Sequence, residues 1–180
     1  SAGSWNIGAE CVVLGWDPTD THTTNFWEEL ASVELGSAGS NLSSGTFTAK
    51  KYLWVQAYMS PAGTIHPNVT FNNDSGTNYS WRFSQNGASD LTEINDTELD
   101  IGGSAGGVFF NMFIINNSAN EKLCMFNYMG AQTAGAGTAP QRIEGVGKWA
   151  NTSSQITEVD FTDTAPDYDT GSIIKVWGSN

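Results

Sequence analysis

Residues 50–59 read KKYLWVQAYM, and residues 108–115 read VFFNMFII. Both stretches carry apolar side chains on both alternating faces, whereas a strand with one face in water alternates apolar and polar residues. Such runs are typical of central strands in a two-sheet sandwich, where one face lies on the core and the other lies under loops or a partner. These two stretches predict an all-β fold.

Short apolar runs separated by Gly, Asn, Ser and Asp continue this pattern along the chain. The stretch FWEELASVEL at residues 26–35 has tolerable helical spacing, but Gly36 leaves room for only one or two turns, so we predict a strand. The predicted strands are residues 11–14, 31–35, 46–59, 68–71, 79–85, 107–115, 122–128, 142–149, 155–161 and 172–177. Together they predict an antiparallel two-sheet β-sandwich with little helix, in a single domain of residues 1–180. Residues 1–26 are predicted to be an N-terminal arm or a partner-contacting strand.

The composition excludes some classes of partner. The chain has 180 residues and a net charge of −12, and its seven Lys and Arg residues are scattered. A nucleic-acid binder needs a basic stripe to displace counterions from phosphates, so nucleic acid and anionic membrane surfaces are poor candidates. No run of about 18 apolar residues is present that would suggest a membrane-spanning helix.

Residues for catalysis are few. The only histidines are His22 and His66, no G-x-S-x-G nucleophile motif occurs, and the Gly-rich loops lack the lysine of a phosphate-binding loop. We therefore expect a protein that is not an enzyme and that works by display and binding.

The stretch TFNNDSGTNYSWRFSQNGASD at residues 70–90 has three interpretations: a hairpin, a metal loop or a ligand site. Asn, Asp and Gly tolerate positive φ or cap their own turn, which favours a structural hairpin at Asn72, Asp74 and Gly76, with positive φ at Gly76. A calcium site needs six to eight oxygen ligands, and the spacing shows no EF-hand repeat. For Arg82, an ion pair or aromatic stacking is favoured over ligand recognition.

Two further groups of residues are candidates for ligand contacts. The segment DFTDTAPDYD carries Asp160, Asp163, Asp167 and Asp169, which could converge on Ca²⁺, although a solvated acidic loop is favoured. Apart from that ion, no cofactor is expected. Trp16, Trp27 and Tyr168 lie near polar loops and could stack on a sugar ring.

The two cysteines, Cys11 and Cys124, both lie in apolar, strand-like settings. Two buried free thiols and a Cys11–Cys124 disulfide are equally compatible with this pattern. Seven Asn-x-Ser/Thr sequons, a mild excess over chance, hint at an extracellular surface.

Taken together, FTAKKYLWVQAYMSPAGT (residues 47–64), VTFNNDSGTNYSWRFSQNGASD (69–90), GKWANTSSQIT (147–157) and GSIIKVWGSN (171–180) resemble a domain of tailed-phage and archaeal-virus structural proteins. The resemblance covers roughly residues 27–178. It implies a jelly-roll-like sandwich on the virion surface, used for decoration, as a fibre or as a tail receptor-binding protein. It also implies a homo-oligomer, often a trimer, that contacts other virion proteins; a host surface glycan is a further candidate ligand. The family offers no shared catalytic or metal residues to carry over.

Aromatic residues on both faces of residues 52–59 and 108–115 exceed what one inner sheet face can bury, which independently predicts self-association. Two other functions remain open: a secreted carbohydrate-binding module, and a subunit of a cell-surface or extracellular filament. Both would show the same acidic surface rich in Gly, Ser, Thr and Asn.

Overall fold

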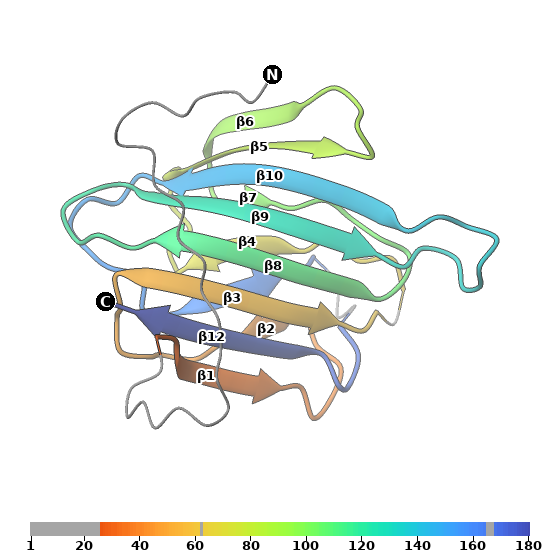
Figure 1. The fold of residues 1–180 in the computed structure, drawn as a ribbon, viewed down its shortest axis with the longest axis horizontal. Coiled ribbons are helices and arrows are strands. Elements are labelled where there is room, and N and C mark those ends of the chain that lie inside the picture. Colours follow the sequence, from red (N-terminus) through yellow and green to blue (C-terminus); the bar gives the residue numbers. More distant parts are fainter. Residues whose placement is uncertain (1–25, 62, 165–167) are drawn as a thin grey trace, which may run out of the picture.

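The computed structural model describes residues 26–61, 63–164 and 168–180, and in these ranges every regular element is a strand. The strands form two antiparallel sheets packed face to face (Figure 1). The described residues contain no helix of the length and apolarity needed to cross a membrane. The predicted antiparallel β-sandwich is confirmed.

The larger sheet has eight strands in the order β1-β12-β3-β8-β9-β10-β5-β6. Figure 1 shows it in front, with β1 and β6 as its two edges. Its strands are β1 (Glu28–Glu34), β12 (Ile173–Ser179), β3 (Tyr52–Met59), β8 (Val108–Ile115), β9 (Lys122–Gly130), β10 (Gln141–Trp149), β5 (Tyr79–Gln85) and β6 (Leu91–Asp96).

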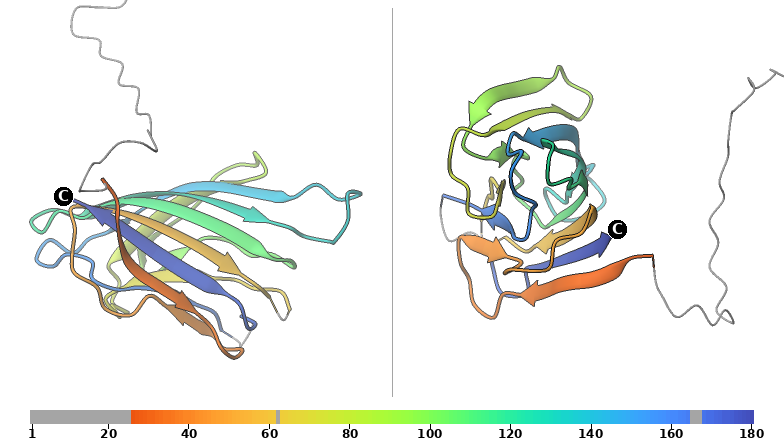
Figure 2. Two further views of the ribbon diagram at one scale, coloured as in Figure 1. Left: turned by 60° about the horizontal axis from the view of Figure 1, so that its bottom comes forward. Right: turned by 90° about the vertical axis from the view of Figure 1, so that its left-hand side faces the viewer.

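The smaller sheet lies behind the larger one and has the order β2-β11-β4-β7 (Figures 1 and 2). Its strands are β2 (Asn41–Ser43), β11 (Val159–Thr162), β4 (Asn68–Phe71) and β7 (Leu99–Asp100). The core fills the space between the sheets: Phe110 and Phe126 from the large sheet are buried, and Phe161 from the small sheet meets the Phe110 ring at 5.0 Å.

The alternation of buried and exposed residues along β9 shows which side chains of the large sheet face the core and which face outward. Its residues are alternately buried and exposed, with Cys124, Phe126 and Tyr128 facing the core. A strand with a period of two places the intervening side chains on the opposite face. Leu123, Met125 and Met129 therefore lie on the outer face of the large sheet, where they are exposed.

The predicted hairpin at residues 72–76 is wrong in its topology, although the turn is present. β4 and β5 flank this turn but belong to different sheets, so the segment crosses between the two layers. Positive φ occurs at Asn72 (54°) and Asn73 (56°) and not at Gly76. Asn72 lies just past the pairing of β4 with β11 in the small sheet, where its Oδ1 accepts the backbone N–H groups of Thr157 (2.8 Å) and Glu158 (3.1 Å), which precede β11.

Several strand boundaries also differ from the prediction. β3 begins at Tyr52 and not at residue 46, and residues 155–158 are not in a strand, because Ile156 and Gln155 there bond to the side chain or carbonyl of Asn116. β2, β6 and β7 were not predicted. The predicted strand at residues 11–14 lies outside the described residues.

Candidate functional site

The outer face of the large sheet carries a row of apolar side chains that crosses the sheet at right angles to the strands. The pairing register places its members directly opposite one another on neighbouring strands. This apolar row consists of Trp177, Trp54, Phe113, Met125 and Val146. Glu29 of β1 pairs with Trp177 at one end, and Arg82 of β5 pairs with Val146 at the other.

A second row runs beside the first, closer to the start of β3. It comprises Tyr52, Ile115, Leu123, Lys148, Ser80 and Ile94, again as successive cross-strand partners. Direct cross-strand neighbours lie about 4.5–5.5 Å apart at Cβ, so the two rows form a continuous surface. Lys148 and Ser80 are its polar members.

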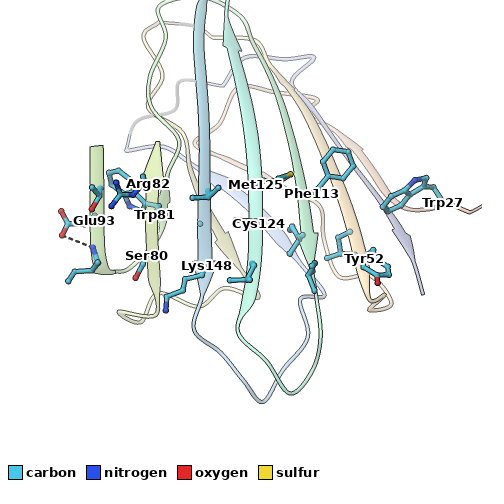
Figure 3. Close-up of a pocket in the computed structure, with 18 of the residues that line it drawn as sticks. Trp27, Tyr52, Ser80, Trp81, Arg82, Glu93, Phe113, Cys124, Met125 and Lys148 are labelled. Carbon is cyan, nitrogen blue, oxygen red and sulfur yellow. Dashed lines mark hydrogen bonds between the residues drawn. The ribbon is translucent and has the colours of Figure 1, made fainter. Parts of the chain in front are cut away.

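Phe113, Met125 and Val146 of the apolar row, together with the whole second row, line a groove of about 750 Å³. Figure 3 shows side chains along it from Glu93 on β6 to Trp27, which precedes β1. Most of the lining residues are Phe, Trp, Ile, Leu, Met or Val, and Arg82, Glu93 and Lys148 are the charged ones. The groove is thus an apolar channel with charges toward its β5–β6 end.

Aromatic contacts fix the other end of the groove. The Trp54 and Phe113 rings stack at 5.7 Å with an interplanar angle of 15°. Trp27 packs on both, at 5.9 Å from Trp54 and 6.5 Å from Phe113. Trp54 Nε1 donates a hydrogen bond to Asn111 Oδ1 at 2.5 Å, which orients the indole. The described part of the chain therefore begins on the outer face, over β3 and β8. The strand that follows, β1, lies on the far side of β12.

The middle of the groove is strongly exposed. Met125 is 60% and Leu123 is 55% exposed, and Val146 beside them is 51% exposed. Monomeric soluble proteins rarely leave large contiguous apolar patches in water, and such patches usually mark interaction sites. The outer face of the large sheet is therefore our candidate functional site.

Two ion pairs lie at the edge of the site. Arg82 pairs with Asp90 and Lys148 pairs with Glu121, each with a nitrogen–oxygen distance of 3.0 Å. The Arg82 pair confirms that this arginine makes an ion pair. Both pairs are well exposed to solvent, so they contribute little to stability and leave the cationic groups accessible.

A polar row lies on the other side of the apolar row. It consists of Lys175, Gln56, Asn111, Asn127, Glu144 and Ser84, which are successive cross-strand partners. Beyond it, Tyr58, Phe109 and Met129 are exposed again. The outer face thus alternates apolar and polar bands.

Of the three aromatic residues predicted to contact a sugar, the structure places Trp27 at the site. The prediction for Tyr168 is wrong, because this residue is fully buried and its backbone bridges to Gly39. Tyr168 therefore has no exposed ring face to offer a sugar. Trp16 lies outside the described residues.

The calcium cluster considered as an alternative for this segment does not form among the aspartates that the structure describes. Asp160 is buried on β11, Asp163 accepts the His66 N–H at 2.7 Å, and Asp169 caps the Thr170 N–H at 2.8 Å. Within the described residues, no three His, Cys, Asp or Glu side chains are arranged to hold a metal ion. The carboxylates do not converge because each completes its own strand or turn. Asp167 lies outside the described residues.

The carboxyl group of Asp160 is buried, which is unusual for an acidic side chain. Burial raises the pKa of its carboxyl, against the lowering effect of the Ser43 hydroxyl, and Glu158 raises it further. These neighbours provide no ring of oxygen ligands, so Asp160 is a buried acid of the small sheet.

The structure gives Cys124 as a free thiol in the core, which agrees with the free-thiol alternative for this residue. Burial raises the pKa of Cys124 to about 12, which makes the thiol unreactive at neutral pH. Its side chain faces inward from β9, beneath Gly147. Cys11 itself lies outside the described residues.

Sequence reasoning identified β3 and β8 as apolar on both faces but missed most of the groove. β9 carries the same signal, because KLCMFNYMG has apolar side chains at both odd and even positions. Val146 and Ile94 could not have been found in this way, since each is an isolated apolar residue among polar ones and only the strand pairing brings it to the groove.

Comparisons of this chain with family models, with curated proteins and with solved structures found no match in any of the three.

Proposed function

We propose that this protein is a non-enzymatic structural subunit that associates with copies of itself through the outer face of its large sheet. The observation that carries the proposal is the apolar row from Trp177 to Val146, in which Phe113, Met125 and Val146 are exposed. Such a row is costly in a protein that stays monomeric and is expected in one that assembles.

The size of this face fits an interface between subunits. Five strands, each counted as about 4.8 Å wide and about eight residues long, cover roughly 24 Å by 26 Å. That footprint, near 600 Å² before the relief of the side chains is counted, approaches the roughly 800 Å² that each partner contributes to a stable interface.

The arrangement of residue types favours another protein surface as the occupant. Trp, Phe and Met at the centre and charges at the rim are the pattern of a protein interface. The rim contains both signs, with Glu29 and Glu144 as well as Arg82 and Lys175. A second copy of this chain carries charges of both signs and can match this rim, whereas an anionic membrane would be repelled by the net charge of −12.

For the place of assembly we propose the surface of a virus particle, as a decoration, fibre or tail attachment protein. This rests on the resemblance of the segments around residues 47–64, 69–90, 147–157 and 171–180 to virion domains. In that role the loops would carry recognition of a host glycan. Residues 131–140, between β9 and β10, extend furthest beyond the sheets (Figure 1).

The experiment is to measure the mass of the full chain in solution by sedimentation equilibrium. We expect the wild-type chain to be a homo-oligomer, with a trimer favoured by the resemblance, and Met125→Glu to shift it at least tenfold toward monomer. Leu91→Glu is the matched control, because Leu91 is 53% exposed but does not line the groove. A wild-type monomer up to near-millimolar concentration, or equal effects of the two substitutions, would refute the proposal.

A second candidate function is sugar binding, and the polar row favours it. Amides and a carboxylate at Gln56, Asn111, Asn127 and Glu144 lie next to aromatic rings, which is the combination that sugar sites use. The stacking of Trp54 on Phe113 argues against it, since each ring already covers a face of the other. Glycan-array binding that Asn127→Ala abolishes, in a chain that remains monomeric, would favour the sugar site over assembly.

A further inference from the structure

We propose that the groove on the outer face receives the apolar segment CVVLGW, residues 11–16, from the N-terminal arm of a neighbouring copy. This inference rests on the proposed function and deepens it, because it names the part of the second copy that docks. The residues of the arm lie outside the described part of the chain, and its sequence, length and point of attachment carry the argument.

The shape of the site argues against two large sheets meeting face to face. The groove is a hollow of about 750 Å³ with residues of β6 at one end and Trp27 at the other. When a face meets its own copy across a twofold axis, hollow lies against hollow. The enclosed space would then be doubled and left empty, which forfeits the contacts that make burial favourable. An extended segment fills such a channel.

The arm has a segment of the right length and chemistry. The groove crosses six strands from β3 to β6, or about five spacings of 4.8 Å, which is roughly 24 Å. Six or seven extended residues cover that distance at about 3.3 Å each. Val12, Val13, Leu14 and Trp16 supply the apolar side chains, and no other part of residues 1–25 has an apolar run of this length.

The point of attachment indicates that the segment comes from another copy. Phe26 and Trp27 lie at one end of the groove, so residue 25 joins the described chain there. The nine residues before Phe26 read DPTDTHTTN and span about 30 Å when extended. Laid into its own groove, the arm would place these polar residues, Asp17 and Asp20 included, against the apolar walls, which is unfavourable. Between two copies, the same nine residues form a spacer that bridges the subunits.

Charged residues lie on both sides of the same arrangement. The apolar segment is bounded by Glu10 and Asp17, and residues 1–25 contain three acids and no Lys or Arg. The receiving groove has Arg82 and Lys148 in its wall, with Glu93 as its acid. Both cations are exposed and are paired with Asp90 and Glu121 in the single chain, so Glu10 and Asp17 of the arm would share or replace these partners.

Cross-linking between two distinguishable copies of the full chain tests the inference. One copy keeps its native Cys11 and is labelled with ¹⁵N; the other carries Cys11→Ser and Met125→Cys. After mixing and mild oxidation, we expect a covalent dimer of one labelled and one unlabelled chain, identified by mass. Cys124 does not interfere, because it is buried. Repeating the test with Val146→Cys in place of Met125→Cys allows for the register of the arm in the groove.

The control receiver carries Cys11→Ser and Leu91→Cys, which puts an equally exposed thiol outside the groove, and should give no such dimer. Two results would overturn the inference: no mixed dimer with either groove thiol, or a disulfide formed only within one chain when Cys11 and Met125→Cys are combined.

A paired measurement separates this inference from the proposed function. We expect Val13→Glu with Leu14→Glu to weaken self-association at least tenfold in sedimentation, and Thr21→Glu in the polar spacer to leave it unchanged. Circular dichroism confirms that each variant is folded. If Met125→Glu dissociates the oligomer and the arm variant does not, assembly through the groove stands and the arm is excluded. If Met125→Glu has no effect, both proposals fail.

Discussion

Asp74 shows how a single residue of the turn at residues 72–76 joins distant parts of the sandwich. Its carboxylate accepts the backbone N–H of Gly76 (2.9 Å), the Asn78 amide (2.9 Å) and the buried Trp149 indole (2.7 Å). Burial alone would raise the pKa of Asp74, but the bonds from Trp149, Gly76 and Asn78 outweigh it and hold the pKa below its usual value. This turn is therefore a structural joint.

Replacing Asp74 with Ala should cost about 2 kcal/mol in the free energy of unfolding at neutral pH, because the Trp149 N–H would be left buried without an acceptor. The lowered pKa means that the contribution is fully present above the pKa of the unfolded chain and is lost as the pH falls through the folded pKa. Urea unfolding should show the gap to wild type closing as the pH drops below about 4. Asp90→Ala, which removes only an exposed ion pair with Arg82, should cost under about 0.5 kcal/mol. A gap for Asp74→Ala that persists undiminished in acid would contradict this account.

For the turn at residues 72–76, the sequence predicts part of the structure. The composition of residues 72–76 indicates a turn, since Asn, Asp and Gly tolerate positive φ or cap their own turn. It cannot show that the positive φ values fall on Asn72 and Asn73, or that Trp149, which is 75 residues away, binds Asp74. Both depend on which segments the fold brings together.

Among the elements, β10 shows how glycines let the core of the large sheet close. Gly145 and Gly147 face the core from β10 and pair with Phe126 and Cys124 on β9. A Cβ at Gly145 would collide with the Phe126 ring and lie 2.8 Å from the Phe83 Cβ. Glycine weakens an isolated strand, but here it makes room for an aromatic ring.

Gly145→Ala should therefore lower the free energy of unfolding by about 1–3 kcal/mol, as expected for an overpacked core. Gly137→Ala is its matched control, because a Cβ there would meet nothing within 4 Å. That change should be neutral or slightly stabilising through the unfolded state. Thermal unfolding of the two variants measures the difference, and equal melting temperatures would mean that Phe126 does not fill the space above Gly145.

Strands were predicted correctly where the apolar pattern is strong. They were missed where a segment forms a strand only because it pairs with a neighbouring strand. β4 and β5 have their predicted bounds, β8, β9 and β10 are close to theirs, and β3 ends as predicted but begins at Tyr52 and not at residue 46. β6 reads LTEIND, which is largely exposed, so no buried face marks it as a strand. It forms because it pairs with β5, and its Ile94 then completes the groove. Sequence reasoning predicted an apolar outer face but could not give its width.

For the whole molecule, the central claim is that the exposed apolar face of the large sheet is covered when the protein assembles. The sequence alone indicated this, through the surplus of aromatic residues in β3 and β8, and the structure adds the groove, its charged end and the entry of the chain beside it. Methionine oxidation reports on this directly, since Met125 is exposed in the single chain and Met59 is fully buried.

The most direct measurement compares the rate of peroxide oxidation at Met125 in the wild-type chain and in Val146→Glu, read by peptide mass spectrometry at a high protein concentration. Val146 lies opposite Met125 in the apolar row, so its substitution should release the partner without altering the core. We predict that Met125 oxidises at least fivefold more slowly in the wild type than in the variant, while Met59 stays slow in both. Equal and rapid oxidation of Met125 in both chains would show that nothing covers the face and would contradict the account.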